Sequence, residues 1–447
     1  MANQEPVTII GGGLAGCEAA WQLAQRGIPT RLYEMRPEVG TPAHQTDKLA
    51  ELVCSNSLKS EAADSASFLL KQELRAMNSL LMRVADSCRV PAGQALAVDR
   101  LLFSTQVTEE ILKLPQVLLL REEMSRIPAE GIVIVATGPL TTNRLSKAIA
   151  EFTGAEHLYF YDAISPIVDA DTLDMSRIYA ASRYGKGGGD DYLNCPMSEE
   201  EYDGFYQALL DAATVPFKDF ETTPFFEACL PLEELARRGR NTLLFGPLKP
   251  VGLNDPRTGR RPCAVLQLRK ENLMSDSYNL VGCQNHMKFG DQQRVFRLVP
   301  GLEQAEFLRY GQVHRNTYIN SPSVLLPTLQ ARCDTRVLFA GQLSGVEGYV
   351  ESIATGLVAG VNSARMARGL EPLTFPESTA CGSLARYISM AEADRFQPAN
   401  ATFGLLPPLS DVDRRRVRDK RKRHLLQVDS ALSAMREFLG RHPEAFG

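Results

Sequence analysis

The stretch Val7-Thr8-Ile9-Ile10-Gly11-Gly12-Gly13-Leu14-Ala15-Gly16 decides the fold of this chain. Its first four residues predict a buried strand, and the glycines that follow fit the pattern G-x-G-x-x-G. Apolar residues then recur with helical spacing from Leu14 to Ala24, until Gly27 and Pro29 end the helix. This order of strand, glycine turn and helix is typical of a dinucleotide-binding βαβ unit.

Three glycines of this stretch have distinct physical roles. Gly11 permits the tight turn, Gly13 lets a pyrophosphate approach the backbone, and Gly16 lets the helix pack closely on the strand. The helix start offers free N–H groups and a positive dipole end to phosphates. A second short strand, Leu32-Tyr33-Glu34, ends on an acid at the spacing expected for a ribose-binding carboxylate. The predicted nucleotide contacts are therefore Gly11, Gly12, Gly13, Leu14, Ala15, Gly16 and Glu34.

Two further strand ends favour FAD over NAD, a choice that the glycine pattern alone leaves open. An apolar strand at 132–135 runs into Ala136-Thr137-Gly138, and Val337-Leu338-Phe339-Ala340 ends in Gly341. A helix is expected from about 352 to 368. This layout resembles flavoproteins with two dinucleotide-binding folds, in which the last strand and helix meet the pyrophosphate and the flavin. Gly341, Gln342 and Tyr349 join the predicted FAD contacts, Tyr349 either beside the isoalloxazine ring or in ordinary helix-start packing.

The segment between these nucleotide-fold signals has a different composition. It carries a glycine-rich stretch at 185–189, many prolines and an alternating strand at 264–268. The predicted fold is α/β, with a Rossmann-type FAD-binding domain and an inserted α/β substrate domain. The FAD-binding domain is expected to be discontinuous, at 1–160 and 321–447, and the inserted domain to span 161–320. Helical spacing is found at 66–87 and 99–114.

Composition is that of an ordinary globular protein and excludes several classes. Of the 447 residues, 44% are hydrophobic and 23% are charged, and the formal net charge is −4. The nine cysteines include no C-x-x-C pair, which argues against a zinc ribbon, and the six histidines are too scattered for a metal site. The first residues lack the pattern of a signal peptide, and no apolar run is long enough to cross a membrane. A cytoplasmic protein is therefore expected.

A dense cluster of positive charge lies near the C-terminus. The run from Arg414 to Arg423 holds eight cations and one acid. Such a density favours phosphate contacts over a merely solvated helix face. Amphipathic helix spacing follows, through Leu425, Leu426, Val428, Leu432, Met435 and Leu439. The predicted partner is a nucleic acid, bound locally although the whole chain is acidic.

Segments across nearly the whole chain resemble the TrmFO family, the folate- and FAD-dependent tRNA uracil-5-methyltransferases related to the GidA flavoproteins. The resemblance is carried by residues 11–18, 52–57, 224–231, 244–252 and 341–349. It implies that methylenetetrahydrofolate donates a one-carbon unit to the T-loop uridine of tRNA (position 54). It also implies that FAD carries the methylene and reducing equivalents, that NAD(P)H regenerates reduced FAD, and that the product is 5-methyluridine. No obligate protein partner is expected.

The resemblance also implies roles for three side chains. Cys229 is the implied nucleophile that adds to uracil C6, a role that suits cysteine because a thiolate attacks readily and leaves again. Cys54 is expected near the flavin as an assisting thiol, and His286 matches a histidine that stacks on the folate pterin. On the sequence alone, ordinary packing is the commoner role for such residues.

Three alternatives stay open at this point. A wobble-uridine-modifying GidA-type flavoprotein would need a longer helical region than the chain has after Arg368. A plain NAD(P)H-dependent flavin oxidoreductase acting on a small molecule needs neither Cys229 nor the basic run. A non-catalytic tRNA-binding flavoprotein would use the basic run alone. The methyltransferase interpretation uses both features.

Overall fold

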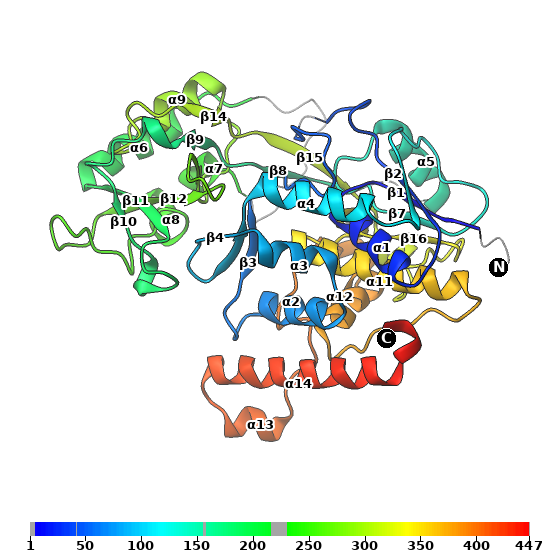
Figure 1. The fold of residues 1–447 in the computed structure, drawn as a ribbon. Coiled ribbons are helices and arrows are strands. Elements are labelled where there is room, and N and C mark those ends of the chain that lie inside the picture. Colours follow the sequence, from blue (N-terminus) through cyan, green and yellow to red (C-terminus); the bar gives the residue numbers. More distant parts are fainter. Residues whose placement is uncertain (1–4, 42, 155–157, 216–229, 447) are drawn as a thin grey trace.

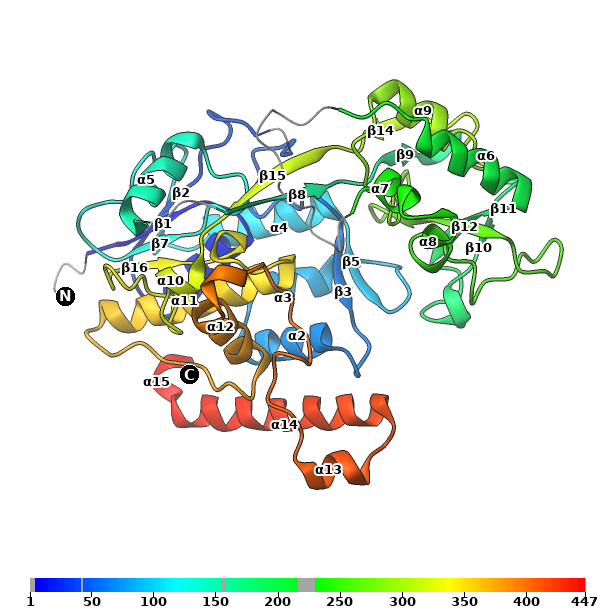
Figure 2. The same cartoon turned by 180° about the vertical axis from the view of Figure 1, so that it is seen from behind.

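The computed structural model describes residues 5–41, 43–154, 158–215 and 230–446, and its two large sheets lie in separate parts of the molecule (Figures 1 and 2). A five-stranded sheet is built from the first third and a late segment of the chain, and a six-stranded sheet from the segment between them. Two antiparallel strands, β8 (Leu158–Ala163) and β15 (Val313–Tyr318), connect the two parts. We propose that the inserted domain begins and ends near these strands.

The five-stranded sheet is entirely parallel, with the strand order β16-β7-β1-β2-β6. Parallel sheets of this kind bury both faces under helices, which is why three of the four residues of β1 are apolar and buried. The late strand pairs in parallel with β7, as a nucleotide-binding fold closed by a distant segment requires. The predicted Rossmann-type α/β fold is therefore confirmed. The strands are β1 (Val7–Ile10), β2 (Thr30–Tyr33), β6 (Val117–Leu120), β7 (Val133–Val135) and β16 (Val337–Phe339).

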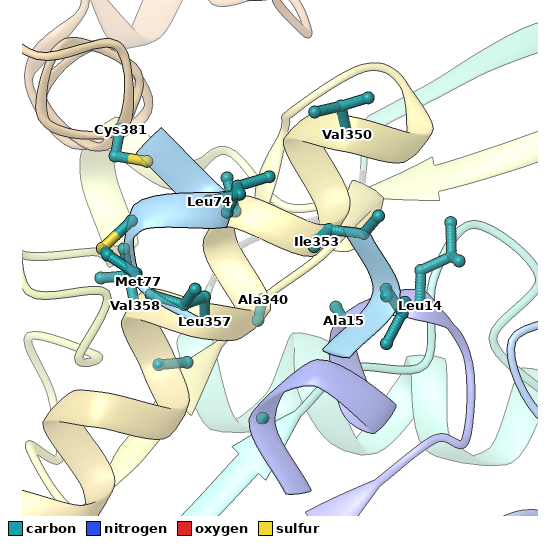
Figure 3. Close-up of a cluster of buried hydrophobic side chains, with 14 of the residues drawn as sticks. Leu14, Ala15, Leu74, Met77, Ala340, Val350, Ile353, Leu357, Val358 and Cys381 are labelled. Atoms are coloured by element: carbon teal, nitrogen blue, oxygen red, sulfur yellow. The ribbon is translucent and has the colours of Figure 1, made fainter. Parts of the chain in front are cut away.

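Helices cover both faces of this sheet. On one face, α1 (Leu14–Gln25) packs against α11 (Tyr349–Ala367), which begins three residues earlier than the sequence predicted. Their buried side chains share one core with α2 (Ala66–Ala76) and α12 (Ala380–Met390), and Figure 3 shows Ala15, Ile353 and Leu74 in this core. On the other face, α5 (Asn143–Thr153) contributes to a second core.

Two helices, α2 (Ala66–Ala76) and α3 (Leu80–Ser87), replace the continuous helical stretch expected here. The break is at Asn78, whose φ of 57° lies in the left-handed region. Ser79 then caps α3 through its side-chain oxygen. The Asn78 carbonyl accepts a hydrogen bond from Trp21 Nε1 at 2.9 Å, so α1 also holds the break. The helical spacing of apolar residues continues across the break at Asn78 because α2 and α3 face the same core, so the sequence pattern did not reveal the break.

The six-stranded sheet is antiparallel, with the order β10-β11-β12-β13-β9-β14, and has a hydrophobic core of its own. Its strand β12 was expected to alternate between buried and exposed residues. In the structure six of its seven residues are buried, among them Gln267 and Arg269. The strands are β9 (Ile167–Asp169), β10 (Tyr179–Ala180), β11 (Tyr192–Met197), β12 (Ala264–Lys270), β13 (Ser277–Leu280) and β14 (Phe307–Arg309), and the helices are α6 (Glu199–Leu210), α7 (Leu232–Arg237), α8 (Arg240–Phe245) and α9 (Phe289–Phe296).

The C-terminal helix α14 (Lys420–Arg441) runs along the first part of the molecule beside α2 (Figures 1 and 2). It is amphipathic as predicted, but its buried face is Val428, Ala431, Met435 and Phe438, and Leu425 and Leu426 are exposed. Among the described helices, none combines the length and hydropathy that a membrane crossing needs. The remaining elements among the described residues are β3 (Ser57–Ser60), β4 (Arg89–Val90), β5 (Ala95–Val98), α4 (Arg100–Leu112), α10 (Ser321–Val324), α12 (Ala380–Met390), α13 (Asp411–Arg416), α15 (Pro443–Phe446) and short 3-10 turns at 170–172, 183–185, 342–344 and 393–395.

Candidate functional site

The glycine turn after β1 has the geometry of a phosphate cradle. A Cβ on Gly11 would lie 2.5 Å from the Ala136 carbonyl oxygen, and one on Gly16 would lie 1.8 Å from the Gly11 oxygen, so both positions require glycine. A Cβ on Gly13 would meet nothing within 4 Å. The backbone at Gly13 is therefore open where a pyrophosphate would approach the start of α1.

Glu34 lies beside this turn, as the spacing predicted. Its Oε2 accepts a hydrogen bond from the Gly12 N–H at 3.0 Å, and its Oε1 accepts one from Arg36 Nε at 2.9 Å. Burial alone would raise the pKa of Glu34, but the hydrogen bonds and charge of Arg36 outweigh burial and hold it below the usual value. The carboxylate is thus kept ionised, which suits an acceptor of ribose hydroxyls.

A pocket opens at the carboxyl ends of β1, β2 and β7, where nucleotides bind in open parallel sheets. The glycine turn forms one wall, and the other walls come from Glu34 to Arg36, Glu122 to Met124, Thr137, Leu140 to Thr142 and Leu145. The open backbone at Gly13 and the ionised Glu34 fit the pyrophosphate and ribose of a dinucleotide such as FAD. The residues Gly11, Gly12, Gly13 and Glu34 all line this pocket.

Of the other predicted cofactor contacts, Gly341 follows the late strand and lies beside α1. Gly341, at φ 76°, lies close enough to α1 that an added Cβ would be 3.0 Å from the Ala15 Cβ. Gln342 Nε2 donates to Glu347 Oε2 at 2.6 Å. Tyr349, the first residue of α11, accepts hydrogen bonds at Oη from the backbone N–H groups of Cys54 and Ser55, at 2.7 and 3.1 Å. Burial raises the pKa of Tyr349, so the phenol stays neutral while it holds this loop.

The Cys54 loop, residues 52–56, is held by three arginines from separate elements. Arg100 of α4 donates to the Leu52 carbonyl at 2.6 Å, and Arg309 of β14 donates to the Val53 carbonyl at 2.7 Å. Arg269 of β12 binds the Ser55 and Asn56 side chains, each at 2.8 Å. Sγ of Cys54 lies 3.8 Å from the Ala163 carbonyl oxygen, and the residue is only partly buried. The loop is therefore held by hydrogen bonds from three cationic side chains.

His286 is held by a buried carboxylate. Its backbone N–H donates to Glu233 Oε1 at 2.7 Å, and its ring Nδ1 contacts the same oxygen. Glu233 is fully buried and His286 is 4% exposed. One face of the histidine loop is therefore tied to α7, close in sequence to Cys229. Cys229 itself lies outside the described residues.

The Cys54 and His286 loops approach the same stretch of chain. Ala163, the end of β8, is the neighbour of the Cys54 thiol, and the next residue is Ile164. A Cβ on Gly311 would lie 2.9 Å from the Ile164 carbonyl oxygen and 2.3 Å from Asn285 Nδ2. Asn285 precedes His286, so the structure brings the two predicted loops together where β8 and β15 join the two parts of the molecule.

The site also contains residues that the sequence analysis missed. The three arginines at the Cys54 loop lie far apart in sequence, so their convergence left no local signal. Arg269 gave no clue either, since it lies in β12 between the polar residues Gln267 and Lys270 and has the appearance of a solvent-facing residue. Among the described residues, no group of histidine, cysteine and acidic side chains could hold a metal ion.

The fold and the pocket define a dinucleotide-binding protein of the flavoprotein type with a second, inserted sheet. Residues 6–371 match the family described as Glucose inhibited division protein A. Two similar curated relatives, from Koribacter versatilis and Solibacter usitatus, are named methylenetetrahydrofolate--tRNA-(uracil-5-)-methyltransferase TrmFO. They are 59% and 58% identical, over 95% and 97% of this chain and 96% and 98% of their own length. The chain belongs to the TrmFO family, within the wider GidA family.

Solved structures agree with this fold. Aquifex aeolicus GidA in two crystal forms superposes with TM-scores of 0.71 and 0.67 over 98% of this chain. The match covers 74% and 79% of those chains, at 16% sequence identity. Because the sequence identity is low, this likeness is evidence for the fold alone.

Proposed function

We propose that this protein methylates C5 of the T-loop uridine of tRNA (position 54), with methylenetetrahydrofolate as one-carbon donor, FAD as cofactor and NAD(P)H as electron source. The observation that carries this proposal is the match, 59% identical over 95% of the chain, to a relative named as a methylenetetrahydrofolate--tRNA-(uracil-5-)-methyltransferase. The same match does not favour a plain flavin oxidoreductase or a wobble-uridine enzyme.

The chain's own groups suit the cofactor that this function needs. When bound, FAD supplies redox chemistry and carries the one-carbon unit. The open backbone at Gly13 and the start of α1 would hold its pyrophosphate, and Glu34 would hold a ribose. Tyr349 stands at the start of α11 and joins this cofactor-binding part of the molecule to the Cys54 loop.

The pyrimidine chemistry needs a thiolate because uracil C5 is a poor nucleophile. Addition of a cysteine Sγ to C6 forms a C–S bond and moves the ring electrons to the C4 oxygen as an enolate, which makes C5 nucleophilic. Once C5 has bonded to the one-carbon unit, a base takes the C5 proton and the thiolate leaves C6. The one-carbon unit enters as a methylene group, so a hydride equivalent drawn from NAD(P)H is needed to reduce it to the methyl group as the bond to its carrier breaks. We assign the adding thiolate to Cys229 and a supporting role to Cys54, which lies beside Ala163 at the junction of the two parts.

The histidine loop suits a flat heterocycle. Glu233 binds the His286 backbone N–H and contacts the ring. The imidazole is therefore held in one orientation before any ligand binds. A fixed imidazole can stack on the pterin of the folate. We further propose that cations within the run Arg414 to Arg423 contact phosphates of the tRNA.

The test is product formation. The purified protein is incubated with unmodified tRNA, methylenetetrahydrofolate and NADPH, and 5-methyluridine is measured by mass spectrometry. We expect product from the parent, none from Cys229→Ala, and full product from the matched control Cys333→Ala, which removes an exposed cysteine. Absence of product from the parent would refute the function, whereas full product from Cys229→Ala would remove only the assigned nucleophile.

A further inference from the structure

A cleft of about 380 Å³ lies at the corner where α13 meets α14, outside the site described above. One wall is the loop from Phe403 to Leu409, and the other is formed by Arg414 of α13 and by Lys420, Arg423 and His424 of α14. Its size is in the lower part of the range of small-ligand sites, roughly 300–1,000 Å³. That volume suits a single nucleotide unit better than a folded segment of another protein.

The cations of this cleft are available for an anion. In the described part of the chain, the carboxylate of Asp64 pairs with Arg421, and no ion pair reaches Arg414, Lys420 or Arg423. Arg423 donates from Nη2 to the Arg418 carbonyl at 3.1 Å, but its Nε is buried and has no hydrogen-bond partner among the described atoms. A buried donor of this kind favours an acceptor from a ligand.

An aromatic pair completes the cleft. The rings of Phe403 and His424 are stacked, with centroids 4.1 Å apart and an angle of 23° between their planes. Both residues are partly exposed and both line the cleft. Aromatic side chains beside a positively charged groove are the arrangement with which proteins bind bases and phosphates of single-stranded nucleic acid.

The cleft is built on a fixed support. Val428, Ala431 and Met435 bury one face of α14 in the main core, so the cationic face is not free to rotate. Both views place α13 and α14 apart from α7 and α9, which flank the His286 loop (Figures 1 and 2). An RNA bound here would be held at a distance from the reacting base.

We propose that this cleft binds one nucleotide of the tRNA substrate away from the target uridine. Its phosphate lies against Arg414, Lys420 and Arg423, and its base lies against the Phe403–His424 pair. The identity of the RNA as tRNA rests on the proposed function, whereas recognition of an RNA strand follows from the charge and the aromatic pair. The cleft therefore contributes to substrate affinity and leaves the chemical step unaffected.

The experiment compares two double variants that remove the same charge. Arg414→Ala/Lys420→Ala empties the cleft of two cations, and Arg415→Ala/Lys422→Ala removes two exposed cations that do not line it. We expect the cleft variant to raise both the KM and the Kd for tRNA about tenfold, with kcat within about twofold of the parent. In the cleft variant, the slope of log Kd against log salt concentration should be smaller than that of the parent by about two. The control variant should change Kd less than about threefold.

Two single substitutions extend the test. Phe403→Leu should weaken binding of a single-stranded oligoribonucleotide about fivefold or more with little change of the salt slope. Arg423→Gln should weaken the same binding without changing the FAD content or the melting temperature. Equal losses in the two double variants would show a diffuse basic face and overturn the proposal, as would unchanged binding in the cleft variant. Binding needs no turnover, so a parent that binds RNA without forming 5-methyluridine would refute the proposed function alone.

Discussion

At the scale of single residues, Gly13 and Gly16 separate cofactor binding from folding. Gly13 has a φ of −78° and open space around it, so Gly13→Ala should change the stability of the FAD-free protein by less than about 1 kcal/mol. The added methyl group stands where the pyrophosphate approaches, and we expect the Kd for FAD to rise at least about tenfold. Flavin fluorescence titration and thermal unfolding measure the two quantities separately.

Gly16→Ala provides the contrast. Its methyl group would lie 1.8 Å from the Gly11 oxygen, so α1 must move off β1 and the free energy of unfolding should fall by about 1–3 kcal/mol or more. FAD affinity would be lost with the fold. If Gly13→Ala destabilised the FAD-free protein as much as Gly16→Ala, the cradle assigned to Gly13 would be wrong.

The Arg36–Glu34 pair gives a pH dependence. Because Arg36 keeps the pKa of Glu34 below its ordinary value of 4.5, the pair stabilises the fold above that pH, and this contribution is lost as pH falls through the lower folded pKa. Arg36→Ala leaves a buried carboxylate without its cation and should cost about 3–5 kcal/mol at pH 7. The cost should shrink below pH 4.5, where Glu34 becomes protonated in the unfolded chain.

Urea unfolding at pH 7 and at pH 4 measures this effect. Arg31→Ala serves as the control, because Arg31 is exposed on β2 and its loss should change stability by less than about 0.5 kcal/mol at either pH. A cost for Arg36→Ala that stayed constant over this pH range would contradict the assigned pairing with Glu34.

Sequence reasoning placed correctly those residues whose position is set by the local backbone, whereas their contacts with a cofactor stay a prediction. Gly11 and Gly16 must be glycine because neighbouring backbone leaves no space for a Cβ. Glu34 reaches the Gly12 N–H because it directly follows β2. Both features depend on short stretches of chain that sequence patterns describe well. The Arg100, Arg269 and Arg309 contacts at the Cys54 loop could not be predicted this way, because only the folded chain brings α4, β12 and β14 together.

At the scale of elements, the contact between α1 and α11 depends on two glycines of α11. A Cβ on Gly356 would lie 2.3 Å from the Ala15 carbonyl oxygen, and one on Gly360 would lie 2.8 Å from the Ala19 Cα. The helices therefore touch backbone to backbone. Since α11 carries Tyr349 at its first residue, this packing also sets where the Cys54 loop is held.

Gly360→Val should push the two helices apart and lower the free energy of unfolding by about 1–3 kcal/mol. The control is Gly204→Val on α6, where an added Cβ meets nothing within 4 Å. Gly369, just past the end of α11, is unsuitable because its φ is positive and any side chain there would be strained. Chemical denaturation measures both. A loss for Gly360→Val no larger than that for Gly204→Val would mean that the α1–α11 contact tolerates a larger spacing.

Elements were predictable where burial follows periodicity and not where a tertiary contact interrupts it. The strands β1, β7 and β16 were recognised from their apolar runs. The break at Asn78 was missed because it is held in part by a hydrogen bond from Trp21, which belongs to another helix. The burial of β12 was missed because Gln267 and Arg269 look like solvent-facing residues, while both are satisfied by hydrogen bonds inside the protein.

At the scale of the whole molecule, polar contacts join the two sheets. Asn56 Nδ2 donates to the Lys270 carbonyl at 2.8 Å, and the Gly93 N–H donates to Asp191 at 2.6 Å. Arg100, which is partly buried, and Glu271, which is buried, form an ion pair at 2.9 Å across the same boundary. Burial alone would lower the pKa of Arg100, but the charge and hydrogen bond of Glu271, together with the nearby Tyr349 and Cys54, outweigh burial and raise the pKa. Arg100 also donates a hydrogen bond to the Leu52 carbonyl. The same residue therefore takes part both in the contacts between the two sheets, here called the joint, and in holding the Cys54 loop.

This sharing allows stability and activity to be separated by a double-mutant cycle. Arg100→Met leaves Glu271 buried without a cation and should cost about 3–5 kcal/mol, whereas Arg100→Met/Glu271→Met should recover part of that loss, with a coupling energy of about 1–3 kcal/mol. The rate of 5-methyluridine formation should fall in both variants, because both lose the hydrogen bond that holds the Cys54 loop. Urea unfolding and kcat are measured on the same preparations. A double variant that regained kcat together with stability would show that Arg100 acts only in the joint, whereas regained stability with a low kcat would assign it to positioning the loop as well.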